Sequence, residues 1–86
     1  MHNKPFQMTS RDINHGALAD SIGYHVEVIR QPAGRRALFI FDETPEIRDL
    51  IDRFERREIL PVPHKALLCS RTRLYYEAAK AVREAL

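Results

Sequence analysis

The sequence predicts an α+β fold in which helices pack on a small antiparallel sheet of two or three strands, in the order β-α-β-β-α-α. Residues 37–41 form an unbroken apolar run with two phenylalanines, which favours a strand buried on both faces. Thr44 and Pro45 follow as a helix start signal. A turn containing Pro32 and Gly34 joins residues 37–41 to an earlier strand-like run, so the two runs are expected to form a hairpin.

The residues before this hairpin are expected to form a short edge strand and one helix. Residues 6–8 alternate apolar, polar and apolar, as edge strands do. Thr9 and Asp12 resemble a capping box with Asp in place of Glu, and Gly23 would close the helix in a left-handed conformation. Gly16 lies inside this helix, where glycine costs about 1 kcal/mol relative to alanine. The strand of the hairpin that follows is predicted to cover residues 24–31.

The central helix after Pro45 has a clear apolar stripe. Its members recur at i, i+3, i+4 and i+7, and they are Ile47, Leu50, Ile51 and Phe54. The opposite face carries acid-base pairs four residues apart, Asp49 with Arg53 and Asp52 with Arg56, which is typical of a solvated helix surface. Strand 37–41 and this helix are therefore predicted to form the nucleus on which the remaining elements pack.

The last third of the chain is predicted to be a connector followed by helix. Pro61 and Pro63 favour an extended connector whose apolar residues, Ile59, Leu60 and Val62, lie under the domain. Pro63 would start the last helix, and its expected buried stripe consists of Leu67, Leu68, Leu74, Tyr75, Ala78 and Val82. Residues 69–72 include poor helix formers, so the pattern leaves open whether 63–86 is one helix or two.

Length and composition indicate one small domain spanning residues 1–86, with a loose N-terminal segment at 1–5. Fourteen basic and 12 acidic side chains give a net charge of +2, well below that of most dedicated nucleic-acid binders. The single cysteine, Cys69, excludes an internal disulfide, and no signal peptide is apparent, so a cytoplasmic location is expected. No apolar run approaches the roughly 20 residues that cross a bilayer, so no membrane partner is expected.

The order of these signals resembles a family of short bacterial and phage domains of unknown function. The resemblance rests on Thr9-Ser10-x-Asp12, a helix closing at Gly23, a hairpin, Phe-Ile-Phe-Asp running into a Pro-Glu-Ile helix, and a Val-Pro step before the terminal helix. It covers roughly residues 6–76. It implies a compact α+β unit that is often a whole protein, and it carries over no active-site residue.

No motif indicates an enzyme, a cofactor or a metal site. The four histidines, His2, His15, His25 and His64, form no pair at metal-binding spacing and are expected to be solvated. Cys69 follows two leucines and is expected to be a buried, inert thiol. Catalytic, cofactor-binding and metal-ligating residues are accordingly predicted to be absent.

One stretch has the composition of a binding surface. Residues 59–76 contain no acid, and basic or aromatic side chains lie in and just before them. The candidate contacts to a partner or to phosphates are Arg56, Arg57, His64, Lys65, Arg71, Arg73 and Tyr76. Two interpretations stay open: a small regulatory module, accessory factor or inhibitor of a bacterium or mobile element that binds a protein partner, or an accessory protein that binds nucleic acid. A homodimer is also expected, because Leu38 and Ile40 would otherwise lie near water.

Overall fold

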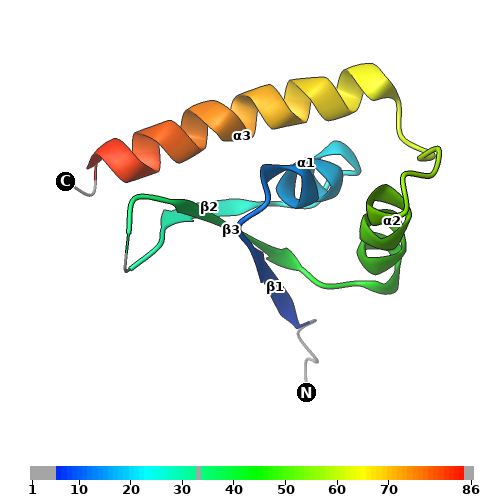
Figure 1. Ribbon diagram of the computed structural model, residues 1–86, viewed down its shortest axis with the longest axis horizontal. Coiled ribbons are helices and arrows are strands. Elements are labelled where there is room, and N and C mark those ends of the chain that lie inside the picture. Colours follow the sequence, from blue (N-terminus) through cyan, green and yellow to red (C-terminus); the bar gives the residue numbers. More distant parts are fainter. Residues whose placement is uncertain (1–5, 33, 85–86) are drawn as a thin grey trace.

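The computed structural model describes residues 6–32 and 34–84 and confirms the α+β class and the predicted element order (Figure 1). The expected loose segment at 1–5 lies outside the described residues. The elements are β1 (Gln7–Ser10), α1 (Ile13–Ser21), β2 (Glu27–Arg30), β3 (Ala37–Asp42), α2 (Pro45–Glu55) and α3 (His64–Glu84).

The sheet is antiparallel with the order β1-β3-β2, so the most apolar strand lies in the middle. β2 and β3 form the predicted hairpin, with Val28 opposite Phe39, while β1 pairs along the other edge of β3, with Met8 opposite Phe41. β3 takes the central position because both of its faces are apolar, whereas the short outer strands have polar residues at both ends.

The core lies between one face of the sheet and the helices. Phe39 and Phe41 point to this face, and α1 and α3 lie on the same side of the sheet in Figure 1. α2 adds Ile47 and Ile51, both buried, to the same cluster, as the predicted nucleus requires. The buried apolar cluster comprises Ala17, Leu18, Ala19, Val26, Phe39, Phe41, Ile47, Ile51 and Leu74.

Two predicted boundaries at the start of the chain are wrong, for local reasons. β1 extends to Ser10, so Thr9 belongs to the strand and Asp12 caps α1, its carboxylate accepting the Asn14 N–H at 2.8 Å. β2 begins at Glu27 rather than at Tyr24, because the Tyr24 N–H donates to the Ala19 carbonyl and extends the end of α1. The predicted cap of α2 is confirmed: Thr44 Oγ1 accepts the Ile47 N–H at 3.2 Å.

α3 is one continuous helix, but its predicted buried stripe was too wide. Leu74 is fully buried, and Leu67 and Ala78 pack against the core, whereas Leu68 and Tyr75 are exposed. Leu74 faces the core, and Tyr75, which lies about 100° further around the helix, falls outside this contact and is exposed. The buried positions of α3 are instead spaced by four residues, as Ser70 and Leu74 are.

The predicted burial of Ile59 and of Cys69 is wrong, because both side chains are exposed. Ile59 is 95% exposed, so the connector does not tuck this side chain under the domain. Cys69 is exposed, because it lies five residues before the buried Leu74 and therefore about 140° away from it around α3. The sequence suggested burial in both cases from apolar neighbours, which do not determine the direction of a single side chain.

The sheet face opposite the helices carries Leu38 and Ile40, with Ile29 directly across from Leu38. All three side chains are partly exposed. The homodimer expected to cover this face stays a prediction. None of the helices in the described residues is both long enough and apolar enough to span a bilayer.

Candidate functional site

The structure places the predicted contact residues along the end of α2, the connector and α3. Arg56 and Arg57 follow the last turn of α2, His64 and Lys65 open α3, and the remaining three lie further along α3. Lys65 and Arg71 are separated by six residues, which is about 9 Å along a helix axis. The basic groups therefore form a line with gaps between them, and two of them already have carboxylate partners.

The two basic candidates that form ion pairs with carboxylates are Arg56 and Arg73. Arg56 donates to Glu58, and that carboxylate raises the pKa of the Arg56 guanidinium. The sequence predicted Asp52 as its partner, which is wrong, whereas the predicted pair of Arg53 with Asp49 is confirmed at 3.0 Å.

Arg73 links two helices through its ion pairs. It bridges Asp20 of α1 and Glu77 of α3, and its Nη1 lies 2.8 Å from Glu77 Oε1. The two carboxylates occupy N–H groups of the guanidinium and would repel an anionic ligand that approaches it. Arg73 therefore holds α3 against α1 more than it faces a partner.

The other basic candidates have no such partner. Within residues 6–32 and 34–84, Arg57, His64, Lys65 and Arg71 are exposed and no carboxylate lies within ion-pair distance of them. Tyr76, the aromatic candidate, is 68% exposed. Of these residues, Arg71 and Tyr76 are the two that line the same hollow.

That hollow belongs to a larger surface, which we call the tyrosine face: Ile13, Arg35, Arg71, Tyr75, Tyr76 and Arg83. Tyr75 and Tyr76 meet edge to face, with ring centroids 5.9 Å apart, and Tyr75 is 64% exposed. Tyr75 lies between two hollows, one lined by Ile13, Arg71, Thr72 and both tyrosines, the other by Arg35, Ala37, Ala78, Ala79, Val82 and Arg83. Among the residues that the structure describes, no acidic side chain lines either hollow.

Sequence reasoning missed Tyr75 and the two outer arginines of this face. The apolar pattern of the last helix places Tyr75 in the core. Arg35 lies in the hairpin turn, and Arg83 lies near the end of α3. The hairpin brings Arg35 to the same hollow as Arg83, although the two residues lie 48 positions apart in the chain. No local sequence signal reports it.

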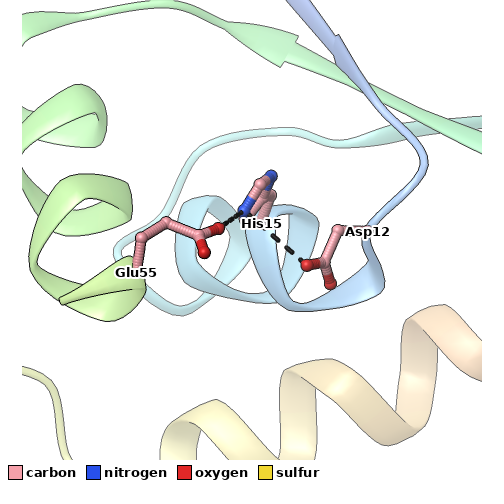
Figure 2. A group of neighbouring side chains, drawn as sticks. All are labelled: Asp12, His15 and Glu55. Carbon is pink, nitrogen blue, oxygen red and sulfur yellow. Dashed lines mark hydrogen bonds and ion pairs between the residues drawn. The ribbon is translucent and has the colours of Figure 1, made fainter. Parts of the chain in front are cut away.

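A second group of polar side chains joins α1 to α2 (Figure 2). His15 Nδ1 lies 2.9 Å from Ser10 Oγ, and His15 Nε2 lies 2.6 Å from Glu55 Oε1 and 3.7 Å from Asp12 Oδ2. The His15 side chain is only 16% exposed and meets the edge of Phe54. The expectation that His15 is solvated is therefore wrong, because α2 folds back and brings Glu55 to it.

The hydroxyl of Ser10, beside His15, and the thiol of Cys69 have different surroundings. Ser10 Oγ accepts the Asp12 N–H at 3.0 Å, which uses the hydroxyl to shape the start of α1. Cys69 has no hydrogen bond to a histidine within the residues that the structure describes. The two candidate functional features are therefore the aromatic and basic tyrosine face and the group in which His15 lies between two carboxylates.

Comparison of the chain with protein-family models, with curated proteins and with solved structures finds no match. The resemblance to short bacterial and phage domains stays a prediction.

Proposed function

We propose that the protein is a small non-enzymatic binding module that holds a protein partner on the tyrosine face. The observation that carries the proposal is the exposure of Tyr75 and Tyr76, side by side, next to Arg71, which has no carboxylate partner among the described residues. Tyrosine and arginine are enriched among residues that dominate protein–protein binding energy. Two hollows beside Tyr75 offer places for a partner's side chains.

The charges of the face indicate the chemistry of the partner. Arg35, Arg71 and Arg83 surround the tyrosines, and both hollows lack acids. A complementary segment would present an apolar or aromatic side chain to a hollow and place Asp or Glu on either side of it, where arginine binds carboxylates through two hydrogen bonds. We therefore propose an acidic, amphipathic peptide segment as the bound element.

Nucleic acid is the alternative ligand, and the experiment must distinguish it from a protein partner. Arg56 and Arg73 are already paired with carboxylates, which lowers the number of phosphates that residues 56–73 can neutralise. Lys65 lies about 9 Å along α3 from Arg71 and would serve a phosphate backbone but not a peptide seated at Tyr75.

The test measures fluorescence polarisation with two labelled probe sets. One set contains 12-residue peptides with a central Phe, Trp or Leu flanked by Asp and Glu, together with scrambled and Lys-substituted versions. The other contains short single- and double-stranded oligonucleotides at low and moderate salt. The variants are Tyr75→Ala, Arg71→Glu and Lys65→Glu. Lys80→Glu serves as the control because Lys80 lines a separate hollow beside β2 and neither of the two hollows at Tyr75.

We expect acidic apolar peptides to bind, and Tyr75→Ala and Arg71→Glu each to weaken binding about tenfold or more, as for hot-spot residues. Lys65→Glu and Lys80→Glu should leave peptide affinity unchanged. Peptide binding that survives Tyr75→Ala, or the absence of any peptide binding, would refute the proposal. Oligonucleotide binding that falls steeply with salt and is lost in Lys65→Glu would support the nucleic-acid alternative instead.

A further inference from the structure

The polar group between α1 and α2 has the composition of a cation site. Asp12 is the N-cap of α1, His15 lies in the first turn of that helix, and Glu55 is the last residue of α2. One ligand atom from each of the three residues lies within 4.8 Å of the others. Figure 2 shows both carboxylates directed toward the same ring nitrogen of His15.

The contacts of the His15 imidazole limit what can lie between Nε2 and the two carboxylates. Nε2 lies 2.6 Å from Glu55 Oε1 and 3.7 Å from Asp12 Oδ2, and carboxylate oxygens are acceptors only. An Nε2–H hydrogen or a bound cation must therefore lie between Nε2 and the carboxylates. On the other side of the ring, Ser10 Oγ lies 2.9 Å from Nδ1 and can accept an Nδ1–H.

We infer that Asp12, His15 and Glu55 bind a divalent transition-metal ion, with Zn²⁺ the best match, through Nε2 and one oxygen of each carboxylate. Zinc takes nitrogen and oxygen ligands at about 2.0–2.2 Å in a tetrahedron, which places neighbouring ligand atoms about 3.3–3.5 Å apart. The observed separations of 2.6 and 3.7 Å lie on either side of this value. The Glu55 carboxylate would have to move away from His15 Nε2 to reach the spacing of zinc ligands. Its side chain is 56% exposed, so it is free to make this small movement.

The surroundings of the ligands match those of known histidine metal sites. Metal-bound histidines donate their other ring N–H to an oxygen, which orients the ring, and Ser10 Oγ occupies this position here. Asp12 is held by the Asn14 N–H at 2.8 Å through Oδ1, which leaves Oδ2 toward His15. Two of the three ligands are therefore fixed on one helix before any metal arrives.

The donor set also favours a particular class of ion. An imidazole favours zinc and its transition-metal neighbours, whereas Ca²⁺ and Mg²⁺ prefer oxygen ligands alone. Three protein ligands leave a fourth position for water or for a group from a partner. The bound ion would join the start of α1 to the end of α2, and this inference does not depend on the tyrosine face.

The experiment compares zinc binding in the wild type, Glu55→Gln and Asp52→Asn by isothermal titration calorimetry and by thermal melts with increasing Zn²⁺. Glu55→Gln keeps an oxygen that accepts a hydrogen bond from His15 Nε2 but removes the anionic ligand. Asp52→Asn removes the same charge from the same helix at an exposed residue outside the group. A third measurement follows the nitrogen resonances of the histidine rings by NMR during the titration.

We expect one Zn²⁺ per chain and a melting temperature that rises with Zn²⁺ concentration, because the folded state alone holds the three ligands together. Glu55→Gln should weaken binding about tenfold or more, and Asp52→Asn should change it less than about twofold, because exposed charges are screened. The Nε2 resonance of His15 should shift while Nδ1 stays protonated. No saturable binding, binding unchanged in Glu55→Gln, or shifts confined to other histidine rings would each overturn the inference.

Discussion

Replacing Gly16 by alanine tests how closely α1 packs on the core. Gly16 is buried in the middle of α1, and a Cβ at this position would lie 3.2 Å from Phe39 Cβ and 3.3 Å from Leu74 Cδ1. Phe39 Cβ is held by the backbone of the central strand, and Leu74 of α3 is fully buried. Both neighbours are buried, so the added methyl requires them to shift by a few tenths of an ångström inside the core.

Two opposing effects determine the size of the change. Alanine favours the helix over glycine by about 1 kcal/mol. Overfilling a packed core costs about 1–3 kcal/mol, and this site is crowded by a strand and a helix at once. We expect the packing cost to exceed the helix preference and Gly16→Ala to lose about 1 kcal/mol of unfolding free energy. For a domain of this size the melting temperature should fall by about 4–8 °C.

Thermal and urea denaturation of the wild type and Gly16→Ala measure this change. Thr72→Ala is the control, since Thr72 is an exposed residue inside α3 and its replacement changes helix preference without entering the core. We expect Thr72→Ala to be neutral or slightly stabilising. In a Leu74→Val background, which removes Cδ1, the penalty of Gly16→Ala should shrink. A higher melting temperature for Gly16→Ala than for the wild type would refute the reasoning.

Two other predictions concern the core and the cysteine. Phe39→Ala and Ile51→Ala should each cost about 2–5 kcal/mol and leave the domain largely unfolded at 37 °C, because both side chains are buried in the strand–helix nucleus; native-like melts of either variant would contradict this. Cys69 should react with a thiol reagent almost as fast in native buffer as in denaturant, because its side chain is exposed; strong protection in the native state would show that the thiol is covered.

The sequence alone determined the elements whose signals are local. Phe39 and Phe41 alternate with Leu38 and Ile40, and this period of two places a two-faced strand at the centre of the sheet. Ile47 and Ile51 recur at helical spacing behind the cap of Thr44, so α2 and its buried face were predictable. Each of these features depends on residues within a few positions of one another, which is the range that periodicity and capping report.

Tertiary structure decided which flank of a helix meets the core and which distant groups meet each other. Tyr75 is apolar enough for the core, but Leu74 occupies the contact line of α3, so the neighbouring tyrosine faces solvent. Gly16 is unfavourable for the helix by itself, but it lies at a position of α1 where a Cβ would crowd Phe39. His15 and Glu55 lie forty residues apart, and only the packing of α2 against α1 brings them within 2.6 Å. Local patterns fix a helix and its preferred face, whereas the rotation of one packed element against another depends on all the side chains between them.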